Sequence, residues 1–148
     1  MATSTLYPLI RKIRRVFQQL RSVSDVMLED LDINASQRAV LEALSGDEPF
    51  SVPQIAKQLS VSRQHVQVLV NELLTKQLVD SLENPAHKRS PLIRITSKGN
   101  KLFASIRKRE HELLAVLQAN FSSTDIAISS TTLETLQELL QSLEKESK

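Results

Sequence analysis

The sequence predicts a mainly α-helical (α+β) protein of one domain, residues 1–148, with a single β-hairpin among long helices. Three observations carry this prediction. Apolar residues recur at spacings of three and four along most of the chain, which is the period of a helix with one buried face. The chain has only 2 glycines and 3% aromatic residues, which favours helices, and its 148 residues suffice for one hydrophobic core. One polar stretch, residues 83–90, separates two short apolar segments and indicates the hairpin.

The first predicted helix spans residues 6–31 and is amphipathic. Its apolar face repeats through Leu9, Ile13, Phe17 and Leu20. The opposite face carries the basic residues Arg11, Lys12, Arg14, Arg15 and Arg21. Such a face can contact phosphate, lipid or only water, and water is the ordinary partner of a basic helical face.

Two short helices and a longer one are predicted next. Asn34 or Ser36 can cap the first of them. Pro53 suits the first turn of the second helix, because its missing N–H has no partner there in any case. Ser62 can cap the third helix, which runs to about residue 76. Only a tight turn separates the second helix from the third.

A hairpin and two further helices complete the prediction. Residues 78–82 and 91–96 are the expected strands on either side of the polar, basic turn. A second long helix follows them, and the Ser- and Thr-rich residues 122–132 are expected to form a linker. Thr131 and Glu134 have the spacing of a capping box that begins the last helix.

The order helix, tight turn, helix, hairpin predicts a winged helix-turn-helix lobe at residues 33–96, with its wing at 79–96. A helix fits the DNA major groove, and a basic hairpin can reach the neighbouring minor groove. Amide side chains can pair with adenine edges, arginine with guanine or phosphate, and valine with a thymine methyl. The expected DNA contacts lie on the helix that follows the tight turn and that Ser62 caps: Ser62, Arg63, Gln64, His65, Gln67, Val68 and Asn71. Each alone is an ordinary exposed residue. Because they share one helical face, together they indicate a surface that contacts DNA bases, here called the reading surface.

The distribution of charge supports binding to a polyanion. In residues 51–101, Lys and Arg outnumber Asp and Glu by eight to three, against six to seven in residues 1–50 and five to seven in residues 102–148. Such clustering suits duplex DNA, because each neutralised phosphate releases counterions. The alternative function is a winged-helix adaptor that binds a protein and not DNA. The basic middle of the chain argues against it.

The sequence offers no catalytic or metal-binding constellation. It lacks cysteine, which excludes disulfides, thiolate ligands and thiol-based sensing. His65, His87 and His111 are far apart and lack metal-ligand spacing, and 2 glycines cannot form a phosphate-binding loop. We therefore expect no enzymatic activity, no cofactor and no metal. No apolar run reaches the roughly 18 residues of a membrane-spanning helix and no signal-peptide pattern is present, so we expect no membrane contact and a cytoplasmic location.

Two segments resemble the MarR family of bacterial winged-helix regulators. They are SVPQIAKQLSVSRQHVQVLVNELLTKQLV at residues 51–79 and NPAHKRSPLIRITSKG at residues 84–99, and the similarity extends over nearly the whole chain. The resemblance implies that Arg89 enters the minor groove with Lys88 as its basic neighbour. It also implies that Thr96, Lys98 and Gly99 begin the helix after the wing.

Three residues depart from the pattern of that family. Asn84 and His87 stand where aspartates are common, so the carboxylate that would orient the wing arginine is absent. A protonated His87 can instead add positive charge toward phosphate. Gln77 stands in place of a glycine before the first wing strand, and a left-handed Gln77 would cost about 1 kcal/mol. The departures predict a wing whose hinge and tip are built differently.

The terminal helices, residues 5–31 and 100–146, are expected to dimerise. They carry more apolar surface than the lobe can cover, including leucines at 133, 136, 140 and 143, although packing within the chain is the alternative. A dimer places two recognition helices on half-sites one helical turn apart. In the family resembled, the first, fifth and last helices form the dimer. We accordingly expect a homodimer on a pseudo-palindromic operator, most simply a repressor.

The resemblance further implies a small-molecule effector held between the dimer helices and the DNA-binding lobe. Phe17, Leu20 and Phe103 can line an apolar cleft there, or pack in the core. The sequence does not identify the effector.

Overall fold

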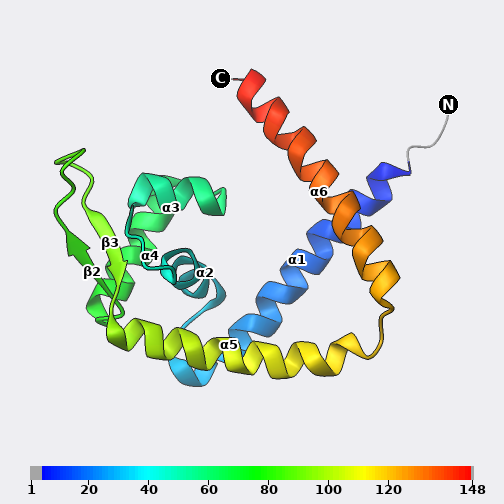
Figure 1. Ribbon diagram of the computed structural model, residues 1–148, viewed down its shortest axis with the longest axis horizontal. Helices are drawn as coiled ribbons and strands as arrows, with labels where there is room; N and C mark the ends of the chain where they lie inside the picture. The colour runs from blue at the N-terminus through cyan, green and yellow to red at the C-terminus, as the bar shows by residue number, and fades with distance from the viewer. Residues whose placement is uncertain (1–4, 148) are drawn as a thin grey trace. The chain divides into compact units, whose positions relative to one another are not determined.

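The computed structural model describes residues 5–147, so residues 1–4 and 148 of the predicted domain lie outside the described part. The elements in chain order are α1 (Leu6–Leu28), the 3-10 turn η1 (Glu29–Leu31), α2 (Ala35–Leu44), β1 (Phe50–Ser51), α3 (Val52–Leu59), α4 (Arg63–Thr75), β2 (Val79–Leu82), β3 (Leu92–Ile95), α5 (Ser97–Gln118) and α6 (Ser123–Glu146). They fall into two compact units, residues 1–106 and 107–148, with the boundary inside α5. The predicted mainly α-helical fold with one hairpin is confirmed (Figure 1).

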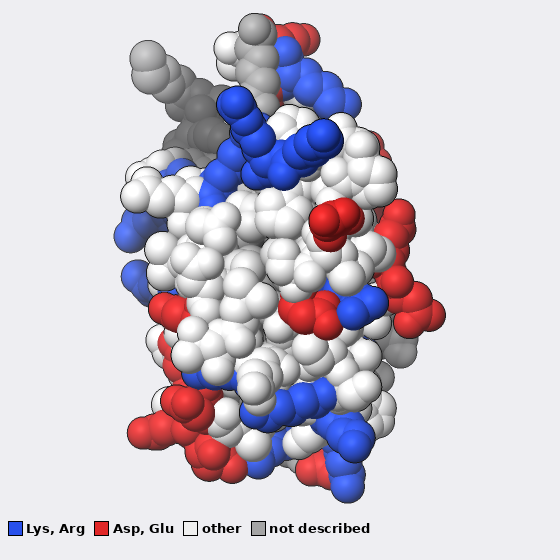
Figure 2. Space-filling model, turned by 90° about the vertical axis from the view of Figure 1, so that its left-hand side faces the viewer, with Lys and Arg blue, Asp and Glu red and all other residues white. Residues whose placement is uncertain are grey.

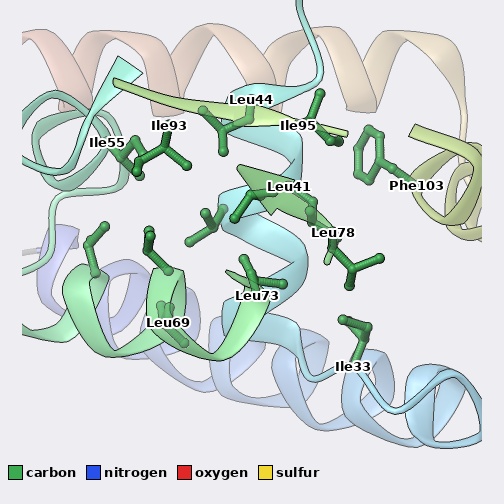
Figure 3. Packing of buried hydrophobic residues seen from close by; sticks show 14 of the residues in the cluster. Ile33, Leu41, Leu44, Ile55, Leu69, Leu73, Leu78, Ile93, Ile95 and Phe103 are labelled. Carbon is green, nitrogen blue, oxygen red and sulfur yellow. The ribbon is translucent and has the colours of Figure 1, made fainter. Parts of the chain in front are cut away.

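In the first unit, α2, α3 and α4 pack around one core, and the hairpin β2–β3 extends from it (Figure 1). Leu41, Leu44, Ile55 and Leu73 are almost completely buried there. Figure 3 shows these side chains together with Ile93 and other residues of the core, contributed by helices and by the sheet. Each fully buried Leu or Ile stabilises the fold by about 1.5–3 kcal/mol relative to an exposed position. This core fixes the winged helix-turn-helix.

The sheet is antiparallel and has the order β1-β3-β2. Ile95 of β3 faces Val79 of β2, and Phe50 of β1 faces Ile93 of β3. Strand β1 was not predicted, because two residues are too few to show an alternating pattern. Ser51 ends this strand and also caps α3, since its hydroxyl accepts from the N–H of Gln54.

The predicted starts of α2 and α4 are confirmed by their caps. Asn34, and not Ser36, caps α2: its Oδ1 accepts from the N–H of Gln37 at 2.8 Å, and Gln37 returns a bond to the Asn34 N–H. Ser62 caps α4 by accepting from the N–H of His65 at 3.1 Å. These caps satisfy backbone donors that a helix leaves without internal partners.

The first helix is close to its prediction. α1 ends at Leu28, and the last three predicted residues form the 3-10 turn η1 before a left-handed Asp32 at φ 55°. Only Leu28 of α1 is buried, whereas Leu28, Met27 and Leu31 all contact the core of the first unit.

The second unit corrects the predicted linker. Residues 122–132 are not a linker, because Ser122 caps α6 and the helix continues unbroken from Ser123 to Glu146. The capping box expected at Thr131 and Glu134 is also wrong, since the Thr131 hydroxyl donates to the carbonyl of Ala127 within the helix. Thr132 and Thr135 bond back to Ile128 and Thr131 in the same way. Hydroxyls that bond to the preceding turn allow a Ser- and Thr-rich segment to remain helical. In residues 5–147, no helix has the length and hydropathy of a membrane span.

Candidate nucleic-acid interface

Helix α4 has one buried side that seats it in the lobe and one exposed side. Val66, Leu69, Val70 and Leu73 all point into the core, with exposed fractions of 0–5%. Their spacing of three and four residues places them on a single face of α4. The other side of the helix is therefore presented to solvent at a fixed angle.

All the residues predicted to read DNA from α4 lie on the exposed part of the chain. They are Ser62, Arg63, Gln64, His65, Gln67, Val68 and Asn71. Val68 is half exposed, so its methyl groups are available to an apolar partner. Gln67 Nε2 donates to Asn71 Oδ1 at 2.9 Å, one turn further along the helix. This bond fixes the orientation of two amides that the sequence analysis treated separately.

The turn between α3 and α4 is held by backbone bonds. α3 ends at a left-handed Ser60 (φ 55°), where the N–H of Val61 donates to the carbonyl of Ala56 at 3.1 Å and Ser60 N–H to that of Lys57 at 3.3 Å. This pattern is a Schellman motif, which ends a helix sharply. Ser62 then begins α4, so two residues separate the helix end from the next cap. The N-terminus of α4 is exposed and presents backbone N–H groups, which favour an anion such as phosphate.

A second Schellman motif joins α4 to the wing. Gln77 is left-handed, at φ 60°, and the N–H of Leu78 donates to the carbonyl of Leu73 at 3.0 Å. Gln77 therefore has the left-handed conformation that a glycine would adopt without strain. Thr96 stabilises this bend, because its hydroxyl donates to the carbonyl of Gln77 at 2.8 Å and accepts from the N–H of Gly99 at 3.0 Å.

Gly99 and Lys98 complete the base of the wing. A Cβ on Gly99 would lie 2.1 Å from the carbonyl oxygen of Leu78, so only glycine fits where α5 crosses this bend. Lys98 Nζ donates to the carbonyl of Lys76, at the C-terminus of α4, at 2.9 Å. Cations are favourable at a helix C-terminus. The residues that begin α5 therefore hold the end of α4 against the start of the wing.

The two arms of the wing are joined by an ion pair. Asp80 and Arg94 are direct cross-strand neighbours, and the Arg94 guanidinium donates to both carboxylate oxygens, at 2.9 and 3.1 Å. This hydrogen bond and the charge of Asp80 raise the pKa of Arg94 above its ordinary value. Arg94 is thereby engaged with Asp80 and is not one of the predicted DNA contacts.

The wing tip is organised by Asn84, which sequence reasoning treated only as a missing aspartate. Its Nδ2 donates to the carbonyl of Ser90 at 2.8 Å, and its Oδ1 accepts from the N–H of Ala86 at 3.1 Å. One side chain thus ties together both sides of the turn. Lys88 and Arg89 are exposed at this tip. An Asx turn at Asn84 is the local signal that could have been found from the sequence.

Figure 2 views the side of the molecule that carries the wing. Lys and Arg side chains gather in separate groups on this face, and uncharged surface and several Asp and Glu side chains lie between and beside them. The basic groups on this face can neutralise phosphates of a polyanion such as duplex DNA.

The three residues predicted to line an effector cleft have different environments. Phe17 and Leu20 on α1 are 59% and 63% exposed, whereas Phe103 on α5 is only 6% exposed and belongs to the core. The guanidinium of Arg38 lies over the Phe103 ring, 5.8 Å from its centroid. An open surface pocket of about 540 Å³ lies elsewhere in the first unit, and none of the three residues lines it. Its lining consists of Asp25, Glu29, Asp32, Ile33, Asn34, Gln37, Glu72, Thr75 and Lys76.

The histidines lie on separate elements. His65 is on α4, His87 is at the wing tip and His111 is on α5. Within residues 5–147, no group of three His, Cys, Asp or Glu side chains is placed to hold a metal ion.

Known proteins share both the sequence pattern and this geometry. Residues 31–90 match the model of the MarR family. The multiple antibiotic resistance protein MarR of Escherichia coli K12 is 31% identical over 117 residues, which cover 76% of this chain and 78% of that protein. The crystal structure of a MarR family transcription regulator has a TM-score of 0.83 at 26% identity, covering 95% of this chain and 93% of that chain.

A second solved structure has a partner in its crystal. A mutant MarR of Escherichia coli, complexed with operator DNA, has a TM-score of 0.79 at 26% identity and covers 88% of this chain and 94% of that chain. The sequence identity, the extent of the match and the common winged helix-turn-helix together show that this chain belongs to the MarR family of transcriptional regulators.

Proposed function

We propose that the protein is a sequence-specific, duplex-DNA-binding regulator that acts as a homodimer on a pseudo-palindromic operator. The observation that carries the proposal is the exposed side of α4, where Arg63, Gln64, Gln67, Val68 and Asn71 stand on a helix seated by four buried side chains. A rigid helix with amides, an arginine and an apolar residue on one face has the donors, acceptors and methyl groups that distinguish base pairs in the major groove. Because such a regulator works on the chromosome, we place it in the cytoplasm.

Ser62, His65 and the wing supply contacts that position the lobe on the DNA backbone. Ser62 and His65 lie at the N-terminus of α4, where backbone N–H groups favour a phosphate. Lys88 and Arg89 project at the wing tip, and Arg89 is proposed to enter the minor groove. Contacts of this kind fix register and affinity, whereas the helix contacts select the sequence. The operator complex of the Escherichia coli MarR mutant, which has the same fold, supports binding to duplex DNA.

The dimer is proposed from apolar surface that neither unit covers. On α1, Val16, Phe17, Leu20, Val23 and Val26 are each at least half exposed. In the second unit, α6 has no buried residue in its described part, and its leucines at 133, 139, 140 and 143 are 46–61% exposed. Exposed apolar stripes of this length mark protein interfaces. A second copy of the chain is the simplest partner, because two recognition helices then bind two half-sites.

Repression by blocking polymerase access is the simplest consequence of operator binding, and release by a small molecule is the proposed regulation. Phe17 and Leu20 offer exposed apolar surface on α1 for such an effector. Phe103 belongs to the core, so the effector part of the proposal depends on the two α1 residues.

A mobility-shift titration with a randomised duplex tests the DNA-binding proposal. We expect a shift whose affinity falls at least about tenfold between about 50 mM and about 200 mM salt, because neutralised phosphates release counterions. Selection of bound fragments from random DNA should then yield a two-fold symmetric site. Absence of any shift at low salt would refute DNA binding and favour the protein–protein adaptor. A monomer by light scattering at micromolar concentration would refute the dimer.

A further inference from the structure

Helix α4 is held from its side by a hydrogen bond that does not belong to the apolar core. Gln37 on α2 is only 5% exposed, and its Nε2 donates to Glu72 Oε2 on α4 at 2.6 Å. The two residues are 35 positions apart in the sequence, so the bond joins separate helices. A hydrogen bond to a carboxylate is shorter and stronger than one between neutral groups, and it is directional.

The amide of Gln37 can point only one way. Its Oε1 accepts from the N–H of Asn34 at 3.1 Å, as part of the capping box of α2. The donor end of the amide is consequently directed at Glu72. Since the same side chain closes the α2 cap and binds α4, the position of Glu72 is tied to the first turn of α2.

A second contact from the same junction reaches the end of α4. Lys76 Nζ donates to the backbone carbonyl of Asp32 and lies 3.4 Å from its Oδ2. On the other side of the junction, Asp25 of α1 accepts from the N–H of Ala35 at 2.6 Å. The end of α1 is thus connected through the α1–α2 junction to two side chains of α4.

Glu72 is well placed to control the rotation of α4. It follows Asn71 directly and lies one turn after Val68, so it stands at the edge between the reading side and the buried side. The apolar contacts of Val66, Val70 and Leu73 determine which side faces the core, but such contacts are not directional. A lateral, directional bond at the edge fixes the angle at which the reading residues are presented.

We propose that Gln37 and Glu72 form a latch that sets the rotation of the recognition helix, and that both are positioning residues for base readout. This inference rests on the proposed DNA-binding function. Through Asp25 and the α1–α2 junction the latch also connects the reading surface to α1, one of the helices proposed to dimerise. Neither residue contacts DNA in this proposal; both act through α4.

A charge-preserving exchange tests the latch. Gln37→Glu keeps the α2 cap, because glutamate serves equally well at this position of a capping box, but it sets two carboxylates against each other. Adding Glu72→Gln restores a donor and an acceptor in the reverse direction and returns the net charge to that of the wild type. Affinity is measured for two duplexes of the same length. One is the duplex that the wild-type protein selects from a randomised library, and the other has a randomised sequence.

We expect Gln37→Glu to lower affinity for the selected duplex about tenfold and affinity for the randomised duplex less than about threefold, because positioning affects specific contacts most. The specificity ratio is the affinity for the selected duplex divided by the affinity for the randomised duplex. On a logarithmic scale, the double variant should recover at least half of the loss in this ratio. Gln18→Glu is the matched control: it makes the same change on the exposed polar side of α1, three and four residues after Arg15 and Arg14, and should leave both affinities as they are.

Should Gln37→Glu prevent folding, Glu72→Ala replaces it. Glu72 is exposed and borders the open surface pocket of about 540 Å³, so water can reach the freed Gln37 amide and the fold should persist. We then expect about a fivefold loss of the specificity ratio, a change smaller than that of a lost base contact. The latch is refuted if Glu72→Ala keeps the wild-type ratio, or if the exchange in the double variant gives no recovery over Gln37→Glu. A wild-type protein that binds no duplex would instead refute the proposed function, and melting temperatures of the same variants would still show whether residues 37 and 72 are coupled.

Discussion

The recognition helix and the wing are attached to the same lobe by different forces. Helix α4 is seated by Val66, Leu69, Val70 and Leu73, whose side chains are nearly completely removed from water. No residue of the wing tip, 83–90, is buried, and the hydrogen bonds of Asn84 organise it. Water does not compete with the apolar contacts of buried side chains, so these hold α4 in one position. Water does compete for the exposed hydrogen bonds of the wing tip. This difference suits the proposed division of roles, with sequence selection by α4 and adaptable backbone contact by the wing.

The largest effect is expected from removing one of the buried side chains that pack α4 against the core. Leu73 is fully buried in the core (Figure 3), and Leu73→Ala should lower the free energy of unfolding by about 3 kcal/mol, since the lost methyl groups leave a cavity. Chemical denaturation followed by circular dichroism measures the change. Val68→Ala is the matched control on the half-exposed side of the same helix and should change stability by less than about 0.5 kcal/mol. Equal losses for the two variants would contradict the two-sided description of α4.

A smaller effect, on affinity, is expected at the wing. Arg89→Ala should weaken binding to selected and randomised duplexes alike, by about tenfold, because a backbone or minor-groove cation contributes to every sequence. The slope of log affinity against log salt should fall by about one. Arg89→Lys keeps the charge and should keep the slope while losing part of the affinity. If Arg89→Ala altered only the preferred sequence, the assignment of the wing to backbone and groove contact would be wrong.

On α4, substitutions should change which sequence is preferred. Gln67→Ala and Asn71→Ala are each expected to alter the selected site at a cost of about 1 kcal/mol on the original one. Because Gln67 donates to Asn71, the two effects should be coupled by about 0.5–1 kcal/mol in a double-mutant cycle measured by binding titration.

The control pair for that cycle is Gln64→Ala with Asn71→Ala. These residues lie two turns apart, and their effects should add. Additive effects for Gln67 and Asn71 would show that the bond between them does not persist on DNA.

The spacing of apolar residues and the helix caps were enough to predict the helices of the winged helix-turn-helix lobe. The helices α2 to α4 each bury one face, and the caps at Asn34 and Ser62 follow from the local preferences of those residues. The helical start of α6 was missed, because the Ser and Thr composition of residues 122–132 indicates a linker unless each hydroxyl finds the carbonyl one turn back.

Contacts between distant positions could not be predicted in the same way. Asn84 acts through a carbonyl six residues away, and the bond from Gln37 to Glu72 spans 35 residues. Each depends on where the core places two backbones, which no local pattern contains. The candidate reading residues of α4 were accessible to sequence reasoning because a single helical face defines them, whereas the side chains that orient this face were not.

The smallest effect is expected at the hinge between the two regions. Gln77 holds φ 60°, a conformation that costs a side chain about 1 kcal/mol and glycine nothing. Gln77→Gly should therefore raise the free energy of unfolding by at most about 1 kcal/mol, since the greater freedom of glycine in the unfolded chain offsets part of the relief. Gln77→Ala removes the same side chain but keeps Cβ, and it should give no such gain in the same denaturation experiment. DNA affinity should be unchanged in both variants, because Thr96 holds the bend through the Gln77 carbonyl, which every residue at this position retains. A loss of affinity in Gln77→Gly would show that backbone stiffness at the hinge, and not the Thr96 contact, aligns the wing with the recognition helix.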